Sequence, residues 1–119
     1  MNDLSERLLD YGARIVTLVS ALPTLVARRI GDQLLRSGTA VGANYEEAQG
    51  AESKADFRHK LQVALKEVRE SNYWLRLLVR AEVVRGERLG TLVDESDQLR
   101  AILSKAVATS KGTQKAAAR

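Results

Sequence analysis

The chain has 119 residues, no cysteine, and a net charge of +4 from 19 basic and 15 acidic residues. This length corresponds to one domain that needs no covalent staple, and the absence of cysteine excludes disulfides and thiolate metal sites. No stretch is apolar enough to span a bilayer, and the acidic start MNDLSERLLD excludes a signal peptide, so we expect a cytoplasmic protein.

The first two predicted elements are helices that meet at a proline. Apolar residues recur every three or four positions from Leu4 to Leu22, which predicts a helix over about residues 3–21 that ends at Pro23. The same spacing resumes at Leu25 and predicts a second helix over about residues 23–50, with the proline in its first turn.

The segment RSGTAVGANYEEA (36–48) of the second helix is unusually rich in small residues. Each glycine costs a helix about 1 kcal/mol relative to alanine, so Gly38 and Gly42 predict the close approach of a neighbouring backbone. Ser37 and Asn44 lie on the apolar stripe of this helix and are therefore predicted to be structural polar residues of the core. A buried amide without a hydrogen bond costs roughly 1–3 kcal/mol, so we expect Asn44 to bond to a facing helix.

A third helix is predicted to begin at an N-terminal cap formed by Ser53, with Asp56 in the first turn. Its apolar stripe continues to about Glu82 and includes Ser71, which is a third polar residue predicted in the core.

A turn at residues 85–87 leads to a fourth helix, which is predicted to fade near Ser110. The short connections make consecutive helices antiparallel neighbours, so the predicted fold is all-α: an antiparallel up-down-up-down four-helix bundle over residues 1–110. Residues 111–119 hold three of the 19 basic residues and no acid, and are expected to be a disordered basic tail. The bundle keeps 16 basic and 15 acidic residues, a net charge of +1, so nucleic acid would have to be attracted by the tail or by a local stripe.

The third helix carries a second apolar face nearly opposite its core face. We interpret this face as the subunit interface of a homo-oligomer, because a helix that is apolar on two sides needs two partners and tryptophan is enriched at interfaces. The alternative is that the tryptophan lies flat on the surface or under a loop. The predicted interface residues are Val63, Glu67, Glu70, Trp74 and Leu77.

Another flank of the third helix carries basic residues with an interleaved tyrosine. Arginines contact phosphates and tyrosine stacks on unpaired bases, so this flank is a candidate nucleic-acid site. The alternative is a solvated charged face on which Lys66 pairs with Glu70. In an assembly of several copies, the stripes and tails become a multivalent surface. The residues concerned are Arg58, Lys66, Arg69, Tyr73, Arg76 and Arg80.

Residues for catalysis or metal binding are not grouped in the sequence. His59, the single histidine, lies three residues after Asp56, but a di-iron site in a four-helix bundle needs a second such pair and further glutamates. Glu46 and Glu47 project in two directions around their helix. No nucleophile with a base and no glycine-rich loop after a strand is present, so we expect no enzyme, metal, cofactor or small-molecule substrate.

Two segments, RSGTAVGANYEEA (36–48) and FRHKLQVALKEVRESNYWLRLL (57–78), resemble the paired signature of the bacterial four-helix-bundle family encoded in intervening sequences of 23S rRNA genes. The resemblance implies a small cytosolic bundle that forms a ring of five subunits and has no established catalytic activity. A role in RNA binding or processing is inferred for the family from the location of its genes. A similar bundle is a basic accessory subunit of reverse transcriptases in diversity-generating elements.

The motif residues of this resemblance match positions that we assign to structure: Arg36, Asn44, Glu47, Glu67 and Glu70. We predict that Arg36 is paired with a carboxylate. Two hypotheses of function follow. The first is a non-enzymatic oligomer, pentameric by resemblance, that binds structured RNA or another nucleic acid through repeated basic patches and tails. The second is a protein-binding scaffold or accessory subunit with no nucleic-acid contact.

Overall fold

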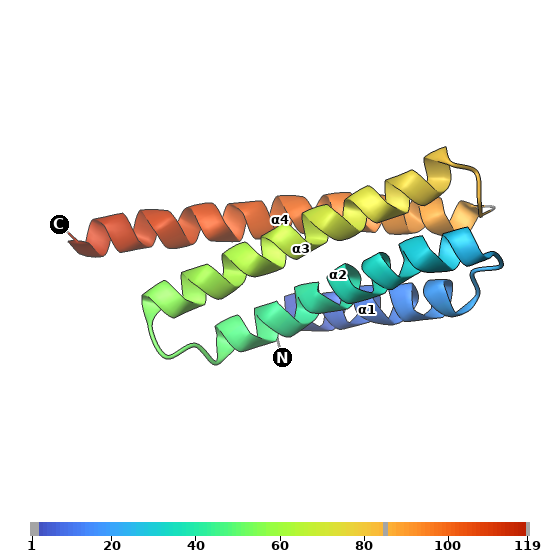
Figure 1. The fold of residues 1–119 in the computed structure, drawn as a ribbon. Helices are drawn as coiled ribbons and strands as arrows, with labels where there is room; N and C mark the ends of the chain where they lie inside the picture. The colour runs from blue at the N-terminus through green and yellow to red at the C-terminus, as the bar shows by residue number, and fades with distance from the viewer. Residues whose placement is uncertain (1–2, 85, 119) are drawn as a thin grey trace.

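Four helices form the chain in the structure, a computed structural model that describes residues 3–84 and 86–118. They are α1 (Asp3–Ser20), α2 (Leu25–Gln49), α3 (Lys54–Arg80) and α4 (Glu87–Ala118). In Figure 1, the α1–α2 and α3–α4 connections lie at one end of the molecule and the α2–α3 connection lies at the other. The all-α prediction is confirmed, since the described ranges contain helices and no strand. None of these helices is long and apolar enough to cross a membrane.

Side-chain caps set the starts of the two central helices. Ser53 Oγ accepts a hydrogen bond of 3.0 Å from the Asp56 backbone N–H, which confirms the predicted cap. Thr24 Oγ1 accepts a bond of 3.1 Å from the Ala27 N–H in the same way. The second helix therefore begins after Thr24, and Pro23 precedes the cap instead of lying in the first turn as predicted.

Two helix ends differ from the prediction. α3 ends at Arg80, slightly early, because Glu82 adopts a φ of 55°, a left-handed conformation that stops a helix. α4 continues past Ser110 and through Gly112 to Ala118, so the end expected near Ser110 is wrong. One glycine costs only about 1 kcal/mol and does not by itself end a helix. The division of the chain at residue 110 into a bundle and a tail stays a prediction.

Glycines of α2 allow α1 to pack closely against it. A Cβ added to Gly38 would lie 2.3 Å from Cδ1 of Ile15, and one added to Gly31 would meet a leucine methyl group at 2.4 Å. A Cβ on Gly42 would lie 3.5 Å from the carbonyl oxygen of Leu8. The predicted close approach to α2 is confirmed, and the neighbour is α1.

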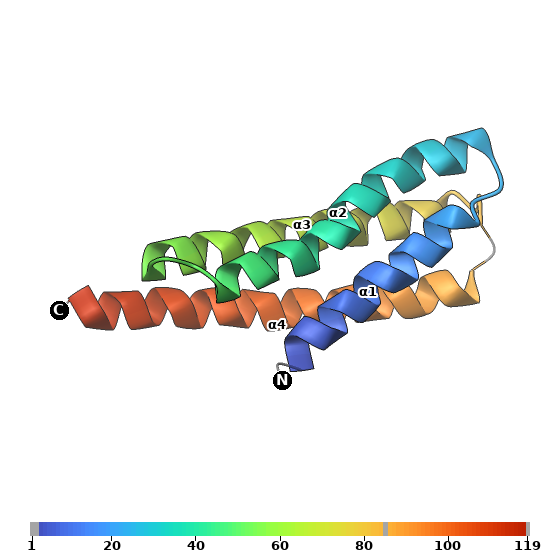
Figure 2. The same cartoon turned by 90° about the horizontal axis from the view of Figure 1, so that it is seen from below.

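The first and last helices differ greatly in length. α1 has 18 residues and α4 has 32, which at 1.5 Å per residue correspond to about 27 Å and about 48 Å. The whole molecule measures 54 × 23 × 22 Å, so α4 extends along most of it. Figure 2 shows α1 beginning beside the middle of α4, which continues without α1 alongside. At this end of the molecule the bundle has three helices.

Replacing Gly38 with leucine should lower the free energy of unfolding by about 1–3 kcal/mol, because the added side chain has no room beside Ile15. The control is Gly90→Ala in α4, where an added Cβ meets no described atom within 4 Å. That change should raise the free energy of unfolding by about 0.5–1 kcal/mol. Urea unfolding followed by circular dichroism measures both, and an unchanged stability of G38L would contradict the close packing.

Candidate functional site

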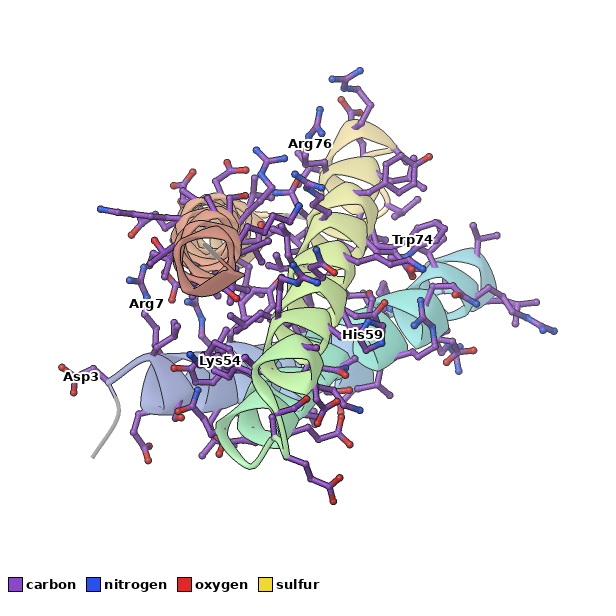
Figure 3. The ribbon with its side chains drawn as sticks, turned by 90° about the vertical axis from the view of Figure 1, so that its left-hand side faces the viewer. Asp3, Arg7, Lys54, His59, Trp74 and Arg76 are labelled. Atoms are coloured by element: carbon purple, nitrogen blue, oxygen red, sulfur yellow. The ribbon has the colours of Figure 1, made fainter. Side chains whose placement is uncertain are left out.

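The third helix carries most of the predicted site residues, and it lies between α2 and α4, with which it makes contact. Figure 3 views the molecule from the end with three helices and shows Trp74 and Arg76 on different sides of α3. The core side, the α2 side and the outer basic side are therefore separate environments.

The core side of α3 forms a buried hydrogen bond with α1. The hydroxyl oxygens of Tyr11 and Ser71 are 2.7 Å apart, and both residues are fully buried. The Ser71 hydroxyl also lies 3.0 Å from the carbonyl of Val68, which can accept its proton. Either hydroxyl of the Tyr11–Ser71 pair can be the donor in the bond between them. Ser71 is buried as predicted, whereas its bond to Tyr11 was not predicted from the sequence.

A second buried contact joins α3 to α4. The Asn72 side-chain amide donates to Ser96 Oγ at 2.7 Å and to Asp97 Oδ1 at 3.0 Å. Ser96 donates to the carbonyl of Val93 at 2.8 Å, so its hydroxyl group is used twice. Sequence reasoning missed Asn72. The sequence held one signal for this contact: Asn72 is a polar residue next to the core residue Ser71, and Ser96 is a polar residue on the apolar stripe of α4.

The two polar residues predicted in the core of α2 bond within their own helix. Ser37 is fully buried and donates to the carbonyl of Gln33 at 2.8 Å. Asn44 is half-buried and donates to the carbonyl of Ala40 at 2.9 Å. The expected bond from Asn44 to a facing helix is wrong, because a backbone carbonyl one turn earlier is within reach of a short amide side chain.

On the α2 side, one arginine holds two carboxylates of α3. Arg36 forms an ion pair of 3.0 Å with Glu67, which is 8 % exposed, and a second ion pair with Glu70. The predicted pairing of Arg36 with a carboxylate is confirmed. Trp74 Nε1 donates to the same Glu70 Oε2 atom at 3.0 Å. This indole bond, together with Arg36, holds the pKa of Glu70 below its ordinary value, although desolvation opposes the shift.

The predicted interface residues lie on this partly covered face. Val63, Trp74 and Leu77 are half-buried within one chain. The Trp74 ring meets Tyr73 edge-on, with ring centroids 5.1 Å apart and an interplanar angle of 75°. The face therefore has intrachain partners on α2 and α3, and its role as a subunit interface stays a prediction.

The outer side of α3 carries the predicted basic stripe. Arg69, Arg76 and Arg80 are exposed, and Arg58 is half-buried. Within the described ranges, none of these four guanidinium groups forms an ion pair. Tyr73 is 54 % exposed between them.

Lys66 is also exposed on this stripe, four residues before Glu70. Its charge contributes to the lowered pKa of Glu70, after the larger effects of Trp74 and Arg36. Glu70 makes its direct contacts with those two residues, so the ion pair expected from the helix spacing does not form among the described side chains.

Two arginines away from the stripe, Arg7 and Arg36, are held in place by carboxylates. Arg7 of α1 forms a two-bond ion pair with Glu95 of α4, at 2.7 and 2.8 Å, and also donates to Gln98 at 2.7 Å. The bonds from Arg7 lower the pKa of Glu95, and desolvation opposes the shift. Arg7 and Arg36 are therefore structural, in contrast to the arginines of the stripe.

The possible metal ligands do not form a cluster. His59 is exposed, while the Asp56 carboxylate accepts a bond of 3.4 Å from the backbone N–H of Glu52. Among the residues whose positions are described, no group of three His, Cys, Asp or Glu side chains could hold a metal ion.

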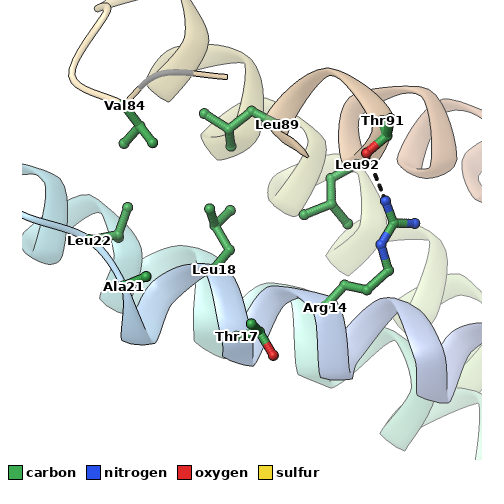
Figure 4. A pocket seen from close by; sticks show the side chains of 9 residues that line it. All are labelled: Arg14, Thr17, Leu18, Ala21, Leu22, Val84, Leu89, Thr91 and Leu92. Atoms are coloured by element: carbon green, nitrogen blue, oxygen red, sulfur yellow. Dashed lines mark hydrogen bonds between the residues drawn. The ribbon is translucent and has the colours of Figure 1, made fainter. Parts of the chain in front are cut away.

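A pocket of about 340 Å³ lies between α1 and the start of α4, near the α3–α4 connection. Arg14 donates to Thr91 there at 2.9 Å, as Figure 4 shows. The other lining side chains are mostly apolar, and none of the predicted site residues lines this pocket. The bond between Arg14 and Thr91 in this pocket is a further link between α1 and α4.

The sequence profile of the 23S rRNA-intervening sequence protein matches residues 3–105. The chain belongs to the 23S rRNA-intervening sequence protein family. A crystal structure of a protein of unknown function from the S23 ribosomal protein family of Bacteroides thetaiotaomicron is similar, with a TM-score of 0.78 and 36 % identity over 87 % of this chain and 96 % of that chain. No curated protein matches the chain.

The predicted family membership is thus confirmed. The family match contains the whole of α3 and therefore both the basic stripe and the face with Trp74. It ends before residues 111–119, so the basic tail lies outside the part that identifies the chain as a 23S rRNA-intervening sequence protein.

Replacing Tyr11 with phenylalanine should change how stability depends on pH. Burial raises the pKa of Tyr11 to about 12, and its bonds to Ser71 and Ser96 only partly offset this. Because the folded pKa lies above the ordinary value of 10, the stabilisation is complete below pH 10 and is lost as the pH rises towards 12. Y11F should be about 1–2 kcal/mol less stable at neutral pH but lose less stability over this window.

Urea unfolding at a series of pH values measures this difference, and the remaining tyrosines, which are common to both proteins, provide the internal control. Parallel pH profiles for the wild type and Y11F would contradict the buried, protonated state of Tyr11.

Proposed function

We propose that this family member is a non-enzymatic cytoplasmic homo-oligomer of up-down-up-down bundles that binds structured RNA through the outer side of α3. The observation that carries the proposal is the contrast between arginines. Arg7 and Arg36 are paired with carboxylates, whereas the arginines of the α3 stripe have no ion-pair partner among the described residues.

The chemistry of the stripe suits an RNA with both phosphates and unpaired bases. An arginine without an intramolecular carboxylate gives up no ion pair when it binds a phosphate, and it releases a counterion from the RNA. Tyr73 lies exposed between Arg69 and Arg76 and offers a ring face on which an unpaired base can stack.

Assembly compensates for the low charge of each subunit. A bundle with a net charge of about +1 attracts RNA weakly, but a ring repeats the same stripe once per subunit. The family resemblance implies a ring of five. Its subunit contact is proposed to include the half-buried face with Val63, Trp74 and Leu77.

A protein-binding scaffold or accessory subunit with no nucleic-acid contact is the second candidate. The exposed apolar side chains of Leu25 and Val26 at the start of α2 favour it, because neighbouring exposed apolar residues are typical of protein contacts. Absence of RNA affinity both with and without residues 111–119 would support this candidate over RNA binding.

Replacing Arg69 and Arg76 together with glutamine should weaken binding to a structured RNA by about tenfold or more, because two phosphate contacts are lost. The dependence of log affinity on log salt should become shallower by about two. Fluorescence anisotropy with a labelled stem-loop RNA at several salt concentrations measures both. The matched control replaces Arg28 and Arg29, which are exposed on α2. Equal losses in the two double variants, or affinity that is insensitive to salt, would contradict the proposal.

Replacing Trp74 with lysine should lower the oligomer mass measured by light scattering. The new ammonium group can meet Glu70, so the fold is preserved, while a charge is introduced into the proposed interface. Tyr73→Lys, on the exposed neighbouring position, is the control and should leave the mass unchanged. A folded W74K protein with the wild-type mass would remove Trp74 from the interface.

A further inference from the structure

One side of α4 contacts α1 along only part of its length. Thr91 binds Arg14, and Glu95 and Gln98 bind Arg7, so these positions mark the side of α4 that faces α1. Steps of three and four residues continue the same side through Ile102 and on to residues 106 and 109. Along this second half of α4, α1 no longer lies alongside, so no fourth helix covers this side of α4.

A groove of about 600 Å³ occupies the position that α1 leaves open. It lies between the start of α3 and the second half of α4, and we call it the end groove. In Figure 3, Lys54 lies on the same side of α3 as α1 and α4. The floor of the groove is apolar, and its two charged residues are lysines that form no ion pair with a described residue. The residues used here are Phe57, Leu61, Ile102 and Ala106 in the floor and Lys54 and Lys105 at the rim.

The outward side of α1 has the complementary chemistry. Leu9 is 66 % exposed and Val16 is 45 % exposed, with the exposed Ala13 between them at helical spacing, and these three side chains form the outer edge of a shallow hollow between α1 and α2. We call these three residues the outer ridge. Glu6 and Asp10 lie along one side of the ridge, are exposed, and form no ion pair with the part of the chain that the structure describes.

We propose that the outer ridge of one copy of this chain docks into the end groove of a second copy. The inference rests on the proposed homo-oligomer and names a second contact within it, separate from the face with Trp74. The ridge would complete the missing fourth position of the bundle, place Leu9 and Val16 on the apolar floor, and bring carboxylates to Lys54 and Lys105. The ridge cannot fill its own groove, because Arg7 ties α1 to α4 at Glu95.

The two surfaces are different, so the contact is head-to-tail. A contact of this kind leaves a free groove on one copy and a free ridge on the other, and each can bind a further copy. It produces a closed ring when the rotation between copies closes, and an open chain otherwise.

Exchange of charges tests the contact. The groove variant Lys54→Glu with Lys105→Glu and the ridge variant Glu6→Lys with Asp10→Lys should each have a lower mass by light scattering than the wild type. A 1:1 mixture should regain a higher mass, because each altered surface then meets one of opposite charge. The control variant Lys66→Glu with Arg69→Glu changes the net charge as much as the groove variant does and should keep the wild-type mass.

Cross-linking tests the same contact by position, since the native chain has no cysteine. Ala13→Cys lies on the ridge and Ala106→Cys lies in the groove, so oxidation of their mixture should give a disulfide-linked dimer. Neither variant alone should do so. Ala101→Cys, exposed on α4 outside the groove, is the matched partner and should give no dimer with A13C.

The outcomes separate this contact from the proposed function. An oligomeric wild type whose mass is unchanged in the charge variants, without the A13C–A106C dimer, would overturn the contact and leave the homo-oligomer standing. Dimers formed by A106C alone would indicate a symmetric contact and would also overturn it. A monomeric wild type would overturn both the contact and the homo-oligomer.

Discussion

The close packing of α1 against α2 is the contact on which the other interactions of α1 depend. A side chain at Gly38 would occupy the space that Ile15 now fills, and the Leu8 backbone lies in van der Waals contact with the position of a Cβ at Gly42. With α1 held at this distance, Tyr11 reaches across the core to Ser71 of α3. The glycines reduce the intrinsic stability of α2, and the apolar contacts that they permit offset this cost.

The partners of the arginines separate structure from candidate function. Arg7 joins α1 to α4, and Arg36 joins α2 to α3, so each holds two helices together through carboxylates that are at least partly buried. Removal of Arg36 would leave Glu67 as a largely buried carboxylate without its partner, which costs more than the loss of a pair in open solvent. The arginines on the outer side of α3 have no such task within the described chain. Family membership agrees with this fold.

Patterns that depend on one helix were predictable from the sequence. The spacing of apolar residues predicted all four helices, and Ser53 predicted the cap of α3, because helices and caps follow from backbone geometry that is local in the chain. The close approach at Gly38 was also predictable, since the cost of glycine in a helix implies a compensating neighbour.

Side-chain partners were less predictable. Asn44 bonds to its own helix because the sequence does not state how far the facing helix lies from its amide group. Asn72 was missed because its partners lie on α4 and meet it only after the helices have packed. The pairing of Arg36 was inferred correctly, whereas the choice of Glu67 and Glu70 as its partners required the relative position of two helices.

The ion pair between Arg7 and Glu95 also determines the register of α1 along α4. The apolar repeat of α4 continues beyond α1, so a slide of seven residues, about 10 Å, towards the end of α4 would still offer an apolar surface. In that register Arg7 would face Ile102 and Lys105 in place of Glu95 and Gln98. Its guanidinium would then lose both hydrogen-bond acceptors and would meet an apolar side chain and a second positive charge. A polar contact that penalises sliding thus acts together with the glycine contacts of α2 to favour one alignment of α1.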